Sequence, residues 1–249
     1  MQNFWSIKVF KLFGIQVELH FTFILLLLLF AWVGFSNDGL LGSLLYIEMI
    51  LLLFSCVLLH EFGHCFVAKH YKIIVPRIIL LPIGGMAQFQ RIPRAPKKEL
   101  FITLAGPLVN IVIFAIIYFF VGWPSKESFA SSNLVSFKGT MYFLMIINLL
   151  MGTFNLLPVF PMDGGRILRA LMALKMPYLK ATYIAVVVGK ILALVGIFIA
   201  IFSLFNWLLA ALFAFIYLGA DAEYAYVKAD EAQRKKLQNL GRPMEDDEI

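Results

Sequence analysis

Long apolar segments separated by short polar stretches dominate the chain. We place six of them, at approximately 15–35, 44–68, 99–121, 140–157, 183–204 and 207–227. A helix needs about 20 consecutive apolar residues to cross the hydrocarbon core of a bilayer, and most of these segments reach that length. Only a few residues around Asn206 separate the last two segments, which we expect to form a helical hairpin. The pattern predicts an all-α polytopic membrane protein with about six transmembrane helices.

The composition agrees with a chain that faces lipid. Of the 249 residues, 61% are hydrophobic and 14% are charged, and the mean hydropathy is +0.88. Soluble domains are roughly 45–50% apolar and about 25% charged, so a core of this size cannot hide the surplus. The first apolar segment is longer than the apolar region of a signal peptide and lacks a cleavage site of small residues. We therefore interpret it as a retained first span.

Lysine and arginine residues alternate between the two sides of the predicted membrane. Two precede the first segment, and they are frequent after the second, fourth and sixth, whereas the loop after the first has none and the loop after the third has two. Short cytoplasmic loops carry the excess of Lys and Arg in membrane proteins. Both termini should therefore be cytoplasmic, in a multi-pass protein of the cytoplasmic membrane. The net charge of +6 has the same origin, so we do not expect nucleic acid as a partner.

Polarity also divides the chain into two parts. Residues 1–227 hold the six apolar segments, and residues 228–249 form a polar tail whose positions 245–248 are all acidic. We expect a membrane domain followed by a cytoplasmic tail. The tail is too short to fold as a second domain, and a short amphipathic helix followed by disorder fits its composition.

The second apolar segment contains the sequence His60-Glu61-Phe62-Gly63-His64. A helix turns once every 3.6 residues, so the imidazoles of His60 and His64 lie one above the other on one face and can hold one zinc ion. Glu61 is placed to accept a proton from a water at that ion. The alternative is a pair of hydrogen-bonded core histidines beside a glutamate. Three ionisable residues within five positions of a membrane helix are costly without a function, which favours the zinc site.

A third ligand is needed, because catalytic zinc has three protein ligands and one open position. Asp163 follows the fourth apolar segment, in a stretch broken by Pro158 and Pro161. Backbone groups freed by proline within a membrane must be satisfied by protein or water, so such a break usually lines a cavity. By the predicted orientation, His64 and Asp163 both lie near the cytoplasmic ends of their segments. We predict one Zn²⁺ held by His60, His64 and Asp163; the alternative for Asp163 is an ordinary carboxylate in a turn.

Four further residues are candidates for roles toward a substrate, Asn155 in catalysis and Asn110, Gly84 and Gly85 in binding. Asn155 could donate to negative charge developing on a substrate carbonyl or hold the substrate backbone, and its alternative role is a helix-end cap. Asn110 could satisfy broken backbone near the site, with the same alternative. The two glycines permit close backbone approach, so a strand edge there could pair with an unwound substrate segment, unless they only form a turn.

The two zinc-binding motifs together resemble those of a known family. His-Glu-x-x-His on an early span and Asn-x-x-Pro-x-x-x-x-Asp-Gly on a later one are similar to the motifs of the site-2 proteases, a family of intramembrane metalloproteases. Asn155, Pro158, Asp163 and Gly164 fit the second motif. Residues 81–87 resemble the family's membrane-associated β-strand region, and residues 105–110 resemble its third-helix signature. The resemblance covers roughly residues 10–175.

The order of the predicted spans resembles the prokaryotic branch that includes the sporulation proteases. We see neither a PDZ insertion between the zinc motifs nor the pair of CBS domains that some members of this branch carry. The resemblance implies a small membrane-associated β-hairpin after the second helix. It also implies a zinc protease that hydrolyses a peptide bond in or near a transmembrane segment, with Glu61 as general base and then general acid.

The resemblance also implies what the chain would act on. Substrates would be membrane-tethered regulators or precursors with a single span, cut in regulated intramembrane proteolysis, and a regulatory membrane partner could control the reaction. Three other functions would use the same residues. A metal-ion transporter would tolerate Glu61→Gln and would need further ligand pairs, of which the sequence shows none. An inactive relative acting as a scaffold would not need Glu61, and metal-dependent hydrolysis of a lipid or small amide stays open.

Overall fold

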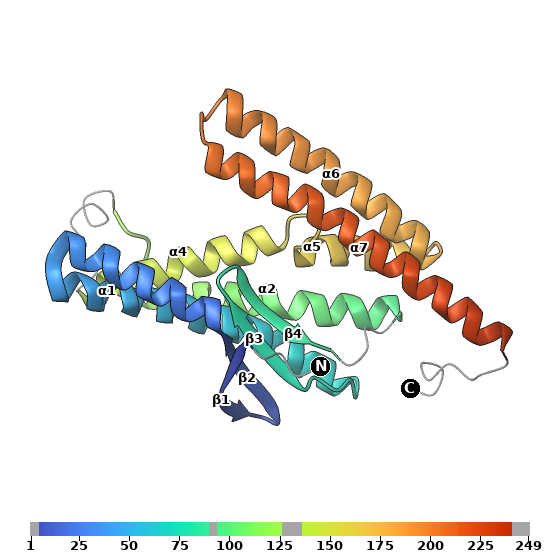
Figure 1. Ribbon diagram of the computed structural model, residues 1–249, viewed down its shortest axis with the longest axis horizontal. Coiled ribbons are helices and arrows are strands. Elements are labelled where there is room, and N and C mark those ends of the chain that lie inside the picture. The colour runs from blue at the N-terminus through green and yellow to red at the C-terminus, as the bar shows by residue number, and fades with distance from the viewer. Residues whose placement is uncertain (1–4, 90–93, 126–135, 241–249) are drawn as a thin grey trace. The chain divides into compact units, whose positions relative to one another are not determined.

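The computed structural model describes residues 5–89, 94–125 and 136–240. The chain divides into two compact units, which we describe separately (Figure 1). The first unit comprises Met1–Arg91 and Ala105–Gly152, and the second comprises Ile92–Leu104 and Thr153–Ile249. Five of the described helices are long and apolar enough to cross a membrane, and the first of them consists of two helices joined at a kink. The six predicted apolar segments are therefore confirmed as helical, apart from their ends.

Helix α1 (Phe21–His70) contains the first two predicted spans. Its backbone leaves the helical conformation at Asp38 and Gly39, and Figure 1 shows the helix folding back on itself there. The two halves meet without intervening side chains, because a Cβ at Gly34 would lie 2.4 Å from the carbonyl oxygen of Gly42. The Ser43 hydroxyl donates to the Ala31 carbonyl across the same contact, at 2.7 Å. Small residues allow this close approach of helices within a membrane.

A four-stranded sheet is formed by residues on both sides of α1. The strands are β1 (Ser6–Leu12), β2 (Ile15–His20), β3 (Arg77–Leu81) and β4 (Gly84–Gln88), in the order β1-β2-β3-β4. The central pair β2–β3 is parallel, and the two outer pairs are antiparallel. The strand region expected after the second span is confirmed as β3 and β4, but half of the sheet comes from the N-terminus.

The expectation that the first membrane helix begins near residue 15 is wrong. Residues 15–20 alternate between apolar and polar side chains, which is the period of a strand, and they form β2. The buried Glu18 accepts from the Ser6 hydroxyl at 2.6 Å and pairs with Arg77 at 3.4 Å, so it is satisfied within the sheet. His20 ends the strand and provides the N-cap of α1.

The first unit is completed by parts of two further helices, α2 (Pro96–Val121) and α4 (Phe137–Asn155). The residues of α2 from Ala105 onward pack on α1 at Gly63, where a Cβ would lie 2.8 Å from the Ala105 carbonyl oxygen. Glycine at this position lets the backbones of the two helices touch. The buried residues of α4 include Asn148, in an otherwise apolar stretch of the helix.

The second unit contains α5 (Asp163–Ala173), α6 (Tyr178–Phe202) and α7 (Trp207–Asn239). Helices α6 and α7 form the predicted hairpin at Asn206, whose side-chain oxygen accepts from the Leu209 N–H at 2.9 Å (Figure 1). Helix α7 continues without a break beyond residue 227, so the helix expected in the polar tail is an extension of the last span. The disorder expected at the acidic end, residues 245–248, lies outside the described residues.

A buried ion cluster in the second unit joins the first residues of α2, up to Leu104, to helices α5, α6 and α7. Arg169 of α5 is 1% exposed and donates from Nε to Glu99 of α2 at 2.9 Å and from Nη1 to Glu223 of α7 at 2.5 Å. The Tyr178 hydroxyl of α6 donates to the same oxygen of Glu99 at 3.2 Å. The guanidinium also stacks over the Phe160 ring, 5.2 Å from its centroid. Because buried charges need partners, this cluster fixes α5 against its neighbours.

Candidate metal centre

Two buried imidazoles of α1 face each other with their Nε2 atoms. The Nε2 atoms of His60 and His64 are 3.1 Å apart, and the two side chains are 4% and 7% exposed. Zinc binds imidazole nitrogen at about 2.0–2.1 Å with tetrahedral angles, which places two such nitrogens about 3.3 Å from each other. The spacing of the two Nε2 atoms therefore fits joint binding of one metal ion, as the i, i+4 pattern predicts.

Helix α2 leaves room for these rings only because residue 106 is glycine. A Cβ at Gly106 would lie 2.3 Å from the Nε2 atom of His64 and 2.7 Å from that of His60. Atoms do not approach so closely without displacement, so any side chain here would push into the space that the two imidazoles occupy. In the sequence Gly106 belongs to residues 105–110, which resemble a family signature, and its steric role becomes visible only in the structure.

The other ring nitrogen of His60 is held by a buried amide. His60 Nδ1 lies 2.6 Å from Asn110 Oδ1, and Asn110 Nδ2 donates to Asn148 Oδ1 at 2.8 Å. Both asparagines are 0% exposed. A substrate contact by Asn110 stays a prediction; in the structure its amide is engaged with His60 and Asn148. Sequence reasoning missed Asn148, although a lone asparagine in an apolar segment is a signal of a buried hydrogen bond.

Glu61 points toward strand β4. The Ala87 N–H donates to Glu61 Oε2 at 3.2 Å. A Cβ at Gly85 would lie 2.5 Å from the Glu61 Cγ atom, so glycine is required for the strand to approach this side chain. Gly84 has a φ of +136°, a conformation that favours glycine, with open space around it. Gly84 and Gly85 thus place an edge strand beside the glutamate that follows His60.

Asp163 is the first residue of α5 in the second unit, and its side chain is 9% exposed. The chain approaching it is tightly folded: a Cβ at Gly164 would lie 2.0 Å from the Leu157 carbonyl oxygen. Phe160, fully buried, packs with Ala185 and Ala220 of the α6–α7 hairpin. Asn155, the last residue of α4, is half-buried. The turn after Asn155 and the close contact at Gly164 therefore determine where helix α5 begins. They thereby determine the position of Asp163, its first residue.

The three predicted ligands have donor atoms of the kinds that zinc binds. Two imidazoles and one carboxylate are ligands that catalytic zinc takes from proteins, and all three side chains are buried. His60, His64 and Asp163 could thus bind a metal ion. The residues present fit the group that the sequence predicts, in donor type and in burial.

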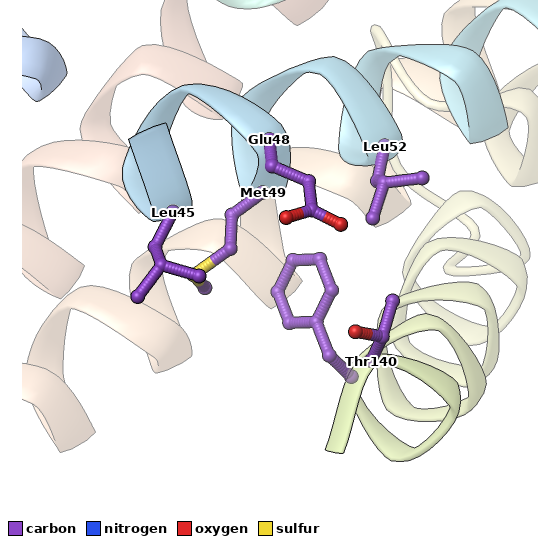
Figure 2. A pocket seen from close by; sticks show the side chains of 6 residues that line it. Leu45, Glu48, Met49, Leu52 and Thr140 are labelled. Carbon is purple, nitrogen blue, oxygen red and sulfur yellow. The ribbon is translucent and has the colours of Figure 1, made fainter. Parts of the chain in front are cut away.

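A separate small hollow lies in the first unit between α1 and α4. Figure 2 shows Glu48 and Leu52 of α1 on one side and Thr140 of α4 on the other, with the Glu48 carboxylate directed into the space between them. Its volume is about 10 Å³, close to the space that one water needs. The hollow is too small for a substrate, and Glu48 itself is exposed, so this glutamate is not part of the candidate centre.

Known proteins resemble most of the chain. A zinc metalloprotease of Methanocaldococcus jannaschii is 42% identical over 226 residues, covering 91% of this chain and 62% of the relative. Stage IV sporulation protein FB of Bacillus subtilis is 32% identical over 137 residues, covering 55% of this chain and 44% of the relative. The chain thus spans less than two thirds of the length of these relatives.

Solved structures and family patterns point the same way. The structure of the site-2 protease from Methanocaldococcus jannaschii is similar, with a TM-score of 0.62 and 40% identity, covering 88% of this chain and 95% of that one. The pattern of peptidase family M50 matches residues 48–131 and 126–196, which include both predicted zinc motifs. With its long apolar helices, the chain is a multi-pass membrane protein that belongs to peptidase family M50, the site-2 proteases.

Proposed function

We propose that the chain is an intramembrane zinc metalloprotease that hydrolyses a peptide bond in or near a transmembrane segment. The observation that carries the proposal is the pair of facing Nε2 atoms of His60 and His64, 3.1 Å apart in a helix long and apolar enough to cross a membrane. Burying such a pair, with Glu61 next to it in sequence, in hydrocarbon costs free energy that packing alone does not offset. The relatives named as zinc metalloproteases support the same activity.

In this proposal one zinc ion is held by His60, His64 and Asp163. Two imidazoles and one carboxylate are the number and kind of protein ligands that catalytic zinc would need. Bound there, zinc would supply Lewis acidity, which activates water and polarises a carbonyl oxygen. The residues themselves provide the geometry, because the side chains are buried and Gly106 leaves space for both rings.

Glu61 is the proposed general base. Its Oε2 atom is fixed by the Ala87 N–H, which leaves Oε1 to take a proton from the attacking water. The same carboxyl group then gives that proton to the nitrogen of the leaving amine as the C–N bond breaks. We assign Asn155 to a supporting role, in which its amide donates to the negative charge that develops on the substrate carbonyl oxygen.

Strand β4 is the proposed docking edge for the substrate. Among the described strands it lies at the end of the sheet and pairs only with β3. An extended peptide can add to such an edge through backbone hydrogen bonds. Because Glu61 contacts Ala87 of this strand, a substrate segment added there would pass beside the proposed base. A helical substrate must unwind to do so.

The proposal extends to substrates and location. Membrane-tethered regulators or precursors with one span fit a reaction performed within the bilayer, and a regulatory membrane partner could control access to it. The distribution of Lys and Arg supports a location in the cytoplasmic membrane with both termini in the cytoplasm. The proposed centre would then lie near the cytoplasmic side.

A comparison of two glutamates tests the proposal. The full chain and its Glu61→Gln and Glu48→Gln variants are purified and reconstituted with a single-span test substrate, and zinc content and cleavage are measured. We expect about one zinc per chain in all three. Loss of the base should lower the cleavage rate of Glu61→Gln by about 10²–10⁴-fold, whereas Glu48→Gln should cleave like the wild type. Normal cleavage by Glu61→Gln, or a wild type without zinc, would refute the assignment.

A further inference from the structure

A chain of buried hydrogen bonds leads from helix α4 through α2 to the candidate ligand His60 on α1. It begins at the Leu144 carbonyl, passes through the amides of Asn148 and Asn110, and ends at His60 Nδ1. The distances along it are 2.8, 2.8 and 2.6 Å. Every side chain in it is at most 4% exposed, and the bonds that join Asn148, Asn110 and His60 are buried.

The far end of this chain determines the orientation of the Asn148 amide. A backbone carbonyl oxygen carries no hydrogen and can only accept, so the Asn148 atom 2.8 Å from the Leu144 oxygen must be Nδ2. The second hydrogen of this NH₂ group points to the Sγ atom of Cys56, 3.2 Å away. Turning the amide over would place Oδ1 against the Leu144 oxygen, two acceptors without a hydrogen between them. Asn148 Oδ1 therefore faces α2.

The orientation of the Asn148 amide determines which atom donates in each of the following hydrogen bonds, as far as His60. Asn148 Oδ1 can only accept, so Asn110 must present its Nδ2 group to it, at 2.8 Å. This leaves Asn110 Oδ1 facing His60 Nδ1, and because that oxygen has no hydrogen, the proton of the hydrogen bond is on Nδ1. A neutral imidazole carries one proton, so His60 Nε2 carries a lone pair and no hydrogen. That atom is the one that faces His64 Nε2.

We propose that Asn148 and Asn110 are positioning residues that hold His60 in the tautomer whose Nε2 lone pair is ready to bind the metal. This inference rests on the proposed zinc site and adds two residues that act through His60. Ligating histidines commonly donate their second ring N–H to a carbonyl or a carboxylate, which fixes tautomer and ring orientation. Here the acceptor is an amide whose own orientation is set by a backbone carbonyl on another helix.

Amides suit this task within a membrane helix. A carboxylate beside His60 would fix the tautomer without help, because both of its oxygens accept, but it would bring a further charge into hydrocarbon. A single amide is neutral, yet it can turn over and present its NH₂ group to the ring. The second amide removes this ambiguity, which explains why Asn148 is needed as well as Asn110.

Zinc affinity of the full chain in detergent, measured by competition with a chelating indicator, tests the proposal. Asn110→Leu removes the acceptor and should weaken zinc binding about 10–100-fold. Asn148→Leu allows the Asn110 amide to turn over and should weaken it less, up to about tenfold. Ser43→Ala is the control, since it removes a buried hydrogen bond of the same unit at the other end of α1 and should bind zinc like the wild type. Wild-type affinity in Asn110→Leu would overturn the proposal.

A double-mutant comparison separates positioning from packing. Asn110→Asp keeps an acceptor for His60 Nδ1 in either orientation, but one carboxylate oxygen then faces Asn148 Oδ1 without a hydrogen between them. Adding Asn148→Leu removes that oxygen, so on the Asn110→Asp background it should cause no loss, and the double variant should recover most of the affinity that Asn110→Leu loses. If Asn148→Leu lowered zinc affinity equally on both backgrounds, Asn148 would act through packing and its positioning role would be refuted.

The tautomer can also be observed in the unaltered protein without zinc. The chain has four histidines, so selective ¹⁵N labelling gives four rings, and the His60 signals are assigned by substitution. In the neutral His60 ring we expect the proton on Nδ1 and none on Nε2. The opposite tautomer would overturn the inference. The tautomer is read from the wild-type chain and needs no zinc binding, so failure of the zinc proposal would not conceal its result.

Discussion

A methyl group added at Gly106 would test whether the two imidazoles use the space that the structure gives them. Its Cβ would lie 2.3 Å from His64 Nε2 and 2.7 Å from His60 Nε2, whereas non-bonded contact requires about 3.5 Å. The rings or helix α2 would have to move by roughly 1 Å. Overpacking of this kind typically costs about 1–3 kcal/mol of folding stability. A displacement of that size at reacting groups can lower a rate by about 10²-fold.

For Gly106→Ala we therefore expect a cleavage rate about 10²-fold lower and a zinc affinity at least about tenfold weaker. The matched control is Gly152→Ala in α4, where the nearest atom to a new Cβ is a side-chain carbon of Ile111 at 3.3 Å, far less crowded than the contacts at Gly106. Alanine is the better helix former by up to about 1 kcal/mol, so the control should be neutral or more stable. Zinc titration, cleavage and thermal unfolding are measured on both variants. Wild-type zinc binding and cleavage in Gly106→Ala would refute the steric reasoning.

Two further predictions follow from close contacts and buried charge. Gly85→Ala places a Cβ 2.5 Å from Glu61 Cγ, so we expect about 10–100-fold slower cleavage with zinc content retained; unchanged cleavage would show that the strand yields instead. Arg169→Met leaves Glu99 buried without its partner and should lower the free energy of unfolding in detergent by about 3–5 kcal/mol. Lys235→Met removes an exposed pair one turn apart on α7 and should change it by less than about 0.5 kcal/mol; equal effects of the arginine and lysine variants would contradict this.

Much of the fold was predictable from the apolar segments, because a membrane helix has a strong signal in composition alone. The N-terminal half of the sheet was not predicted. Residues 15–20 alternate between apolar and polar side chains, but they run directly into the apolar stretch of α1, and a search for long apolar segments merges the two. Helix α5 was also missed, since it is short and amphipathic and crosses no membrane. Its start follows from the turn after Asn155, which depends on packing around Gly164.

The candidate centre was also predictable from the sequence only in part. The pairing of His60 with His64 follows from helical spacing, and the structure confirms that their Nε2 atoms meet. The contacts of Asn110 and Asn148 depend on which helices become neighbours, and a single sequence carries no record of that. The role assigned to Glu61 stays a prediction that the Glu61→Gln variant addresses, and the roles of Asn155 and Asp163 stay predictions.

The hydrogen bond between Glu61 and Ala87 reduces the number of backbone groups on the edge of β4 that could pair with a substrate peptide. Successive N–H groups of a strand point to opposite sides, so only those of Gly85 and Ala87 face outward, and Glu61 already takes the second. About three backbone groups stay available, each worth roughly 1 kcal/mol net. Their sum corresponds to a dissociation constant weaker than about 1 mM. Pairing with this edge can therefore align a peptide but cannot hold it bound, so its binding would depend on how its own helix packs against the helices of this chain.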